Sequence, residues 1–272
     1  VLAKDKAQPG GNASSLVTRN FTYDIIKPTA ALVVPAPAAA CDYIRSLPTI
    51  SGTAVDNFAD GMSNVRISIK RTREPLKWFG GVSFNQDLET WLNPTYLSPS
   101  ATFWIYAPSE LDGQLGVYCT YYLILTRGID VAGSTQTVLG LNISSRTFLY
   151  DKWSGDSTIG FPAHQQKYKP TAVSGSEYPL SGTAGDNPTG SFNAGLKKVE
   201  IRLSYIDGGS TYYWRDNYLD FSSYNVTNNG WTDANNTTSW DYSDSINWGG
   251  VDREYTLEAR TEDNTVLGDG SG

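Results

Sequence analysis

The chain has 272 residues, a formal net charge of −7, one histidine and two cysteines, and its charged residues are scattered along it. Without a stripe of lysine and arginine to release counterions from phosphates, nucleic acid is not expected as a partner. No apolar run approaches the ~18 residues that a membrane helix requires, so membrane insertion is not expected either. The sequence carries no phosphate-binding loop, dinucleotide fingerprint or nucleophile elbow, and we expect no enzymatic activity.

The composition is typical of a soluble globular β protein. Tyrosine (17), tryptophan (8) and glycine (26) are abundant, and there is a single methionine. Few cysteines together with Asn-x-Ser/Thr sequons suit an extracellular or cell-surface protein, which is the localisation that we expect. The sequons begin at Asn12, Asn20, Asn142, Asn225, Asn235 and Asn236.

The chain opens with an alternating segment, SSLVTRNFTYD, at residues 14–24. A period of two between apolar and polar residues predicts a β-strand. Its last six residues, RNFTYD, return as RTFLYD at residues 146–151. The phrase KPTA at residues 27–30 returns at residues 169–172.

The phrase SGTAVDN at residues 51–57 returns as SGTAGDN at residues 181–187, at an offset of 181 − 51 = 130. A repeat at this distance indicates two copies of one folding unit in tandem. We expect an N-terminal extension carrying a strand at residues 1–26, a first domain at residues 27–151, a linker or docking arm at residues 152–168, and a second domain at residues 169–272.

Further strands match between the two copies. VRISI at residues 65–69 corresponds to VEIRL at residues 199–203, and YLILTR at residues 122–127 corresponds to YTLEAR at residues 255–260. Tryptophans follow in the same order in each copy, as expected of residues that pack between sheets. Trp78, Trp91 and Trp104 match Trp214, Trp231 and Trp240.

This series of phrases (F-x-Y-D, K-P-T, S-G-T-A-x-D-N, V-x-I, Trp and Y-x-L-x-x-R) resembles the bacterial immunoglobulin-like modules of large cell-surface and extracellular proteins. The resemblance covers nearly the whole chain. Short strands separated by Gly, Asn and Asp turns also indicate an antiparallel sandwich. We therefore expect an all-β protein with two tandem immunoglobulin-like β-sandwiches and an orphan N-terminal strand.

The two copies differ at their last strand. Residues 261–272 follow the second copy without a Phe-x-Tyr-Asp phrase, whereas residues 14–24 carry that phrase without a module before it. A sandwich that lacks an edge strand can accept one from another molecule. We predict that residues 14–24 of one copy complete the second domain of the next, in a head-to-tail extracellular filament. The donor residues are Leu16, Val17, Arg19, Phe21 and Tyr23.

Three alternatives stay open. A segment cut from a longer array of such modules would show the same two ends, and the missing strand could also come from a different protein. The third alternative is an adhesin or glycan-binding stalk that presents a loop to a glycan or host-surface ligand. Trp153 and Trp248 have no counterpart in the other copy and are the candidate ligand-binding residues.

Two further sites are suggested by residue type. Cys41 and Cys119 have no counterpart in the second copy and are candidates for a disulfide within the first domain. The acidic loops that contain Asp56, Asp60 and Asp186 could supply oxygen ligands to calcium, although Asp-Asn is also ordinary turn chemistry. No other cofactor is expected.

Overall fold

The structure is a computed structural model. It describes residue 5 and residues 15–36, 43–58, 61–96, 103–117, 119–169, 179–190, 192–224 and 226–268. Nearly all regular structure in these residues is β, as expected from the alternating sequence patterns. The helical turns described are α2 (Leu111–Leu115), η2 (Asp216–Tyr218) and η3 (Thr227–Gly230). Within the described residues, no helix has the length and apolar character to cross a membrane.

The first unit is a β-sandwich built from two sheets. One sheet has the order β1-β3-β8-β7 and the other has the order β2-β10-β9-β4-β5-β6. Their inner faces share one hydrophobic core, which includes Leu32 and Trp104 from the first sheet and Ile67 and Ile124 from the second. The strands are β1 (Thr29–Val34), β2 (Tyr43–Ser46), β3 (Ile50–Val55), β4 (Met62–Arg71), β5 (Lys77–Phe79), β6 (Phe84–Gln86), β7 (Thr95–Tyr96), β8 (Phe103–Tyr106), β9 (Thr120–Asp130) and β10 (Ser145–Tyr150).

The second unit has its own core, between a β11-β12-β17 sheet and a β15-β14-β13-β16 sheet in which β18 also pairs with β13. Leu180 and Trp240 from one sheet meet Ile201 and Leu203 from the other. The strands are β11 (Asp156–Phe161), β12 (Leu180–Gly185), β13 (Leu196–Asp207), β14 (Ser210–Arg215), β15 (Asp220–Ser222), β16 (Trp231–Asp233), β17 (Ser239–Tyr242), β18 (Thr256–Asp263) and β19 (Val266–Leu267).

The sequence repeat corresponds to a repeat in strand register. Gly52 pairs with Trp104 across β3 and β8, and Gly182 pairs with Trp240 across β12 and β17. Likewise β9 pairs with β4 as β18 pairs with β13, and both pairs have a register shift at the same place, between Met62 and Asn64 and between Leu196 and Lys198. In these strand pairs the two units place equivalent residues at equivalent positions.

Residues 152–168 are not simply a linker. Asp156 to Phe161 form β11, which pairs with β12 in the same way that β1 pairs with β3, including a bulge two residues before the end. The segment is too rich in Ser, Thr and Gly to show the apolar alternation that predicts a strand. The KPTA phrase at residues 169–172 therefore led to a predicted start of the second domain that is too late. The second unit begins before that phrase, most of which lies outside the described residues.

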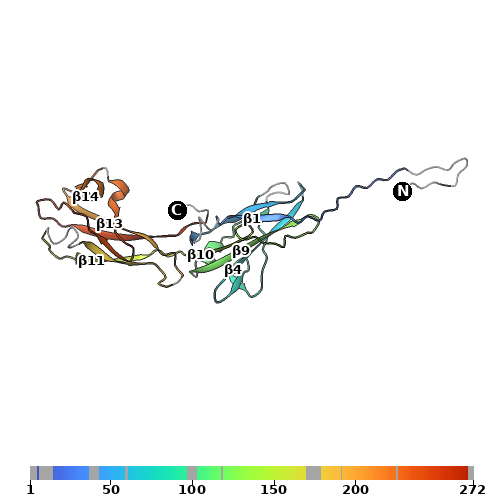
Figure 1. Ribbon diagram of the computed structural model, residues 1–272, viewed down its shortest axis with the longest axis horizontal. Coiled ribbons are helices and arrows are strands. Elements are labelled where there is room, and N and C mark those ends of the chain that lie inside the picture. Colours follow the sequence, from blue (N-terminus) through green and yellow to red (C-terminus); the bar gives the residue numbers. More distant parts are fainter. Residues whose placement is uncertain are drawn as a thin grey trace.

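The N-terminal residues form an arm that leaves the first unit at the end opposite the second unit (Figure 1). Residues 15–28 pair with no described strand. At the other end of the first unit, β19 follows β18 and adds to β2 in parallel, which extends the larger sheet to β19-β2-β10-β9-β4-β5-β6. The two units are thus joined by the chain between β10 and β11 and by this short strand.

Candidate functional sites: an open sheet edge and a carboxylate cluster

In the first unit, β10 covers the edge of β9. The strand pairs antiparallel with β9 from Ser145 to Tyr150, and the side chains of Arg146, Phe148 and Tyr150 are buried. The Phe148 ring stacks on that of Tyr122, with 6.0 Å between centroids. As a result, the residues of β9 that face the core are buried at every second position.

In the second unit, the equivalent edge is open. Among the described strands, β18 pairs only with β13. The counterparts of Tyr122 and Ile124 are Tyr255 and Leu257, and both are only half-buried although they face the core. The structure therefore leaves an apolar row and a line of backbone groups uncovered along β18.

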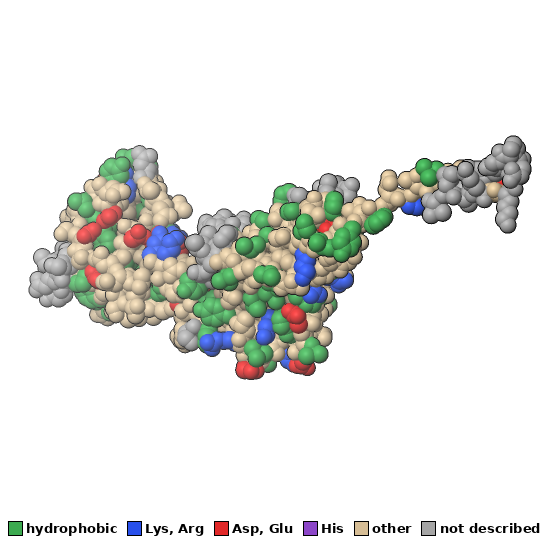
Figure 2. Space-filling model, turned by 45° about the vertical axis from the view of Figure 1, so that its right-hand side comes forward, with side chains coloured by type: hydrophobic (Ala, Val, Ile, Leu, Met, Phe, Trp, Pro, Cys, Tyr) green, Lys and Arg blue, Asp and Glu red, His purple; other side chains and the backbone are tan. Residues whose placement is uncertain are grey.

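The N-terminal arm carries the same pattern as β10 but makes none of its contacts. In the aligned phrases RNFTYD and RTFLYD, the arm has Arg19, Phe21 and Tyr23 at the positions of Arg146, Phe148 and Tyr150. Phe21 is 89% exposed and Tyr23 is 81% exposed. The remaining predicted donor residues, Leu16 and Val17, are exposed as well. Figure 2 shows hydrophobic side chains along the arm, and the face in view has no continuous stripe of lysine and arginine.

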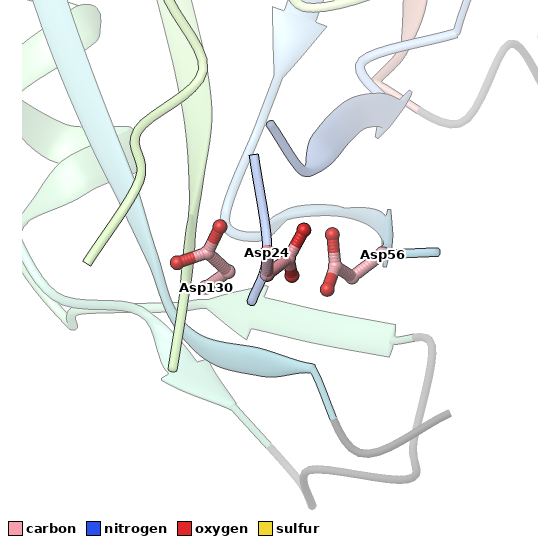
Figure 3. A group of neighbouring side chains, drawn as sticks. All are labelled: Asp24, Asp56 and Asp130. Atoms are coloured by element: carbon pink, nitrogen blue, oxygen red, sulfur yellow. The ribbon is translucent and has the colours of Figure 1, made fainter. Parts of the chain in front are cut away.

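Three carboxylates meet at the base of the arm. Asp24 comes from the arm, Asp56 from the loop after β3, and Asp130 from the end of β9, and one oxygen of each lies within 4.8 Å of the others. Figure 3 shows the three side chains side by side. Asp130 is only 1% exposed, and its Oδ1 accepts a hydrogen bond from the Ser134 amide at 2.7 Å. Its Oδ2 is buried and has no hydrogen-bond partner within the described residues.

The second unit has aspartates at the same three positions, Asp151, Asp186 and Asp263. Burial raises the pKa of Asp151, and backbone amides that bond its carboxylate work in the opposite direction. The pKa of Asp186 is also raised, first by burial and further by the charge of Asp151. Of the three residues that the sequence suggested for calcium, Asp56 belongs to the cluster at the base of the arm, Asp186 stands at the position equivalent to Asp56 in the second unit, and Asp60 lies outside the described residues.

The predicted disulfide involves Cys119, which is described, and Cys41, which is not. Cys119 is a free thiol, 3.6 Å from Asp151 Oδ1, and Cys41 lies outside the described residues. Burial raises the pKa of the Cys119 thiol to about 11, with the charge of Asp151 as a smaller cause. At neutral pH this thiol is protonated, so it is not an activated nucleophile.

The six matched tryptophans lie in two environments, and Trp78, half-buried with Lys70 Nζ 5.1 Å from its ring centroid, does not share the buried environment of Trp214. Trp104, Trp214 and Trp240 are buried in the two cores. Trp91 and Trp231 are half-buried under arginines: Arg127 lies 3.9 Å from the Trp91 ring centroid, and Arg202 and Arg260 lie over Trp231. Cation–π contacts of this kind stabilise the outer face of a sheet.

The two unmatched tryptophans also differ from each other. Trp153 is 56% exposed, just after β10. Trp248 is half-buried, with its ring edge-on to Tyr255 at 4.8 Å between centroids. Trp248 thus belongs to the aromatic cluster behind the open edge of β18, and Trp153 keeps a free face.

Sequence reasoning missed two of the clustered carboxylates. Asp24 closes the F-x-Y-D phrase and recurs as Asp151, and Asp130 follows the Y-x-L-x-x-R strand by three residues, as Asp263 does. Their recurrence at fixed places in the repeat was a signal that could have found them. What no sequence pattern indicates is that these ends converge on the loop that carries Asp56.

Comparisons with known proteins do not identify the chain. No protein-family model matches it. No curated protein matches it either. A similar solved structure is the cryo-EM reconstruction of the native conformation of Escherichia coli alpha-2-macroglobulin, at 9% identity and a TM-score of 0.26, covering 97% of this chain and 16% of that one. The chain thus spans a small part of that protein's length, and at this TM-score the likeness carries no argument about fold or function.

Proposed function

We propose that the chain is a structural subunit of an extracellular filament, built from immunoglobulin-like sandwiches, in which the N-terminal arm of one copy adds to the β18 edge of the next. The observation that carries this proposal is the contrast between β9 and β18. With β10 in place the core-facing residues of β9 are buried, and without such a strand their counterparts Tyr255 and Leu257 are half-exposed. An edge of this kind is a surface to which extended strands add.

The register follows from the first unit. Phe148 pairs with Tyr122 and Thr147 pairs with Leu123 across β10 and β9. The corresponding pairs between copies are Phe21 with Tyr255 and Asn20 with Thr256.

The arginine of the strand has a defined place in the same register. Arg146 is fully buried and donates to the Pro35 carbonyl, which follows β1, at 2.6 Å. The residue that follows β11 in the same way is Pro162. Arg19 would donate to the Pro162 carbonyl of the next copy.

The energy available is large enough for a stable contact. Burying roughly 200–300 Å² of Phe21 and Tyr23 contributes about 6 kcal/mol at about 25 cal/mol per Å², before the entropy cost of ordering the arm. Strand pairing adds hydrogen bonds for the unpaired edge. The arm and the second unit lie at opposite ends of the molecule (Figure 1), so a copy does not close on itself and the contact propagates as a line.

Electron microscopy tests the assembly. The full chain should form filaments, whereas a chain lacking residues 1–23 and a Phe21→Asp variant should stay monomeric while both sandwiches remain folded by circular dichroism. Filaments from Phe21→Asp would contradict the proposal. Single particles from the full chain would show that the strand completing β18 comes from another part of a longer array or from another protein.

Cysteine cross-linking tests the register. In a Cys41→Ser, Cys119→Ser background, Asn20→Cys with Thr256→Cys should give disulfide-linked ladders, because directly opposite residues have the Cα separation that a disulfide needs. Asn20→Cys with Glu258→Cys, two residues out of register, is the matched control and should cross-link poorly. Equal ladders from both pairs would mean that the contact has no fixed register.

A further inference from the structure

The carboxylate cluster at the base of the arm has a buried acceptor that the protein itself does not satisfy. Asp130 is only 1% exposed, and its Oδ2 has no hydrogen-bond partner among the described residues. One oxygen of this carboxylate lies within 4.8 Å of one oxygen each of Asp24 and Asp56, and Figure 3 shows the three side chains next to one another. A buried carboxylate oxygen without a donor or a cation is costly, so its place in a group of three carboxylates points to a bound positive charge.

No side chain supplies that charge in the described part of the chain, where none of the ion pairs involves these three aspartates. Three carboxylates at this separation repel one another. The donor set consists of oxygens only, which excludes the nitrogen and sulfur ligation typical of zinc. Calcium accepts six to eight oxygens in an irregular shell and fills the remaining positions with water, as an open cluster at the surface allows.

The second unit provides an internal comparison. There the equivalent of Asp24 is Asp151, whose Oδ1 accepts a hydrogen bond from the Trp153 amide at 3.2 Å and whose Oδ2 accepts one from the Ala194 amide at 2.7 Å. Backbone amides thus compensate both oxygens of that carboxylate. Asp24 accepts from one backbone amide in the described residues, that of Ile26 at 3.0 Å. The two backbone amides that bond Asp151 use different oxygens, whereas Asp24 accepts its backbone amide on Oδ1 alone.

We propose that Asp24, Asp56 and Asp130 bind one calcium ion. The ion would connect the base of the arm to the loop after β3 and to the end of β9, and so would hold the arm in one direction as it leaves the first unit. This inference stands independently of strand addition, because all three ligands belong to one copy.

Calorimetric titration of the chelator-treated full chain with CaCl₂ tests the site. The Phe21→Asp chain, which should not form filaments, is titrated in parallel so that filament assembly does not contribute heat. Calcium binding and filament assembly are thereby tested independently of each other. We expect binding to this cluster in both chains and a higher unfolding temperature with calcium. Asp130→Asn should weaken binding at least about tenfold, because calcium affinity follows the charge of the ligand set. Asparagine keeps the Oδ1 acceptor for the Ser134 amide, so the turn is retained.

Two further variants make the result decisive. Asp24→Asn lies in the arm, outside both hydrophobic cores, and should weaken binding without affecting folding. Asp87→Asn, an exposed carboxylate paired with Lys77, is the control and should bind calcium as the unmodified chain does. Absence of binding at millimolar calcium, or binding that is unchanged in both Asp130→Asn and Asp24→Asn, would overturn the proposal.

Discussion

A glycine and a tryptophan form the same close contact in both units. A Cβ on Gly182 would lie 1.9 Å from the Thr158 carbonyl oxygen and 2.5 Å from Cζ2 of Trp240. On Gly52 it would lie 1.9 Å from the Ala31 oxygen and 2.4 Å from Cζ2 of Trp104. Only glycine lets the edge strand approach while the buried indole covers the central strand. The glycine of the repeated SGTA phrase is therefore required by packing in both units.

Gly182→Ala should destabilise the second unit by about 3 kcal/mol, because the new methyl group must displace backbone or the Trp240 ring. Gly185→Ala in the same strand is the control: its Cβ would meet nothing within 4 Å. That change should stay within about 0.5 kcal/mol. Urea unfolding of both variants measures the difference, and equal stabilities would refute the packing argument.

A buried glutamate organises the outer face of β13. Glu200 is 3% exposed and accepts hydrogen bonds from Arg260 Nε at 2.7 Å and Lys198 Nζ at 2.8 Å. Burial by itself would raise the pKa of Glu200, but these two cations outweigh it and lower the pKa below its usual value.

A lowered pKa in the folded state gives a pH-dependent contribution to stability. It is fully present above the pKa of about 4.3 in the unfolded chain and is lost as the pH falls through the folded pKa. Glu200→Gln should therefore cost about 3 kcal/mol at pH 7 and progressively less below about pH 4. Glu258→Gln, at a more exposed pair, should cost under about 1 kcal/mol. Chemical unfolding from pH 3 to 7 compares them, and a pH-independent deficit for Glu200→Gln would contradict this account.

At the scale of elements, β10 and the N-terminal arm carry one sequence pattern in two situations. In β10 the pattern forms a strand that is buried against β9, whereas in the arm it pairs with no described strand and is exposed. Its apolar residues alone do not decide the outcome, because a strand without a partner leaves its own backbone groups unpaired. β18 shows the complementary situation, a strand with one neighbour.

A free peptide with the sequence of residues 15–24 should raise the unfolding temperature of a chain lacking residues 1–23, because it binds the folded second unit and not the unfolded chain. The same peptide with Phe21→Asp should have no effect. Calorimetry over a range of peptide concentrations measures the shift. A shift of equal size with both peptides would indicate binding that does not involve the β18 edge.

At the scale of the whole molecule, the two units are connected in the described residues by backbone pairing of β19 and by side-chain contacts. The backbone of β19 lies against the edge of β2, and the Gly268 amide and carbonyl bond the Ser46 carbonyl and the Ala36 amide, each at 2.9 Å. Arg73 of the first unit lies 3.5 Å from the centroid of the Phe192 ring of the second. Backbone pairing at this junction restricts rotation between the units.

Val266→Asp should release β19, because Val266 packs against the core of the first unit. The Ala36 amide would then exchange its hydrogen more than about tenfold faster, since its bond to Gly268 opens locally. Val251→Asp, at an exposed position, is the control. Unchanged exchange at Ala36 in Val266→Asp would show that β19 does not hold the junction.

Strand alternation and repeated phrases were sufficient to predict an all-β protein and to align β3, β4, β8 and β9 with their counterparts in the second unit. These features are local. Burial on one face of a strand requires apolar residues at every second position, and the contact between glycine and tryptophan requires glycine at the same place in both copies of the SGTA phrase. The start of the second unit was misplaced because β11 lies at a sheet edge, where a strand of Ser, Thr and Gly needs no apolar pattern.

The tertiary structure alone decided which strand edge is open and which carboxylates meet. Neighbours across a sheet are set by the path of the chain in space, so among the described strands β18 has one partner although its sequence matches that of β9. Likewise Asp24, Asp56 and Asp130 are brought together by three separate turns at one end of a sandwich. Local sequence carries the pattern of each strand, whereas long-range pairing determines what each strand touches.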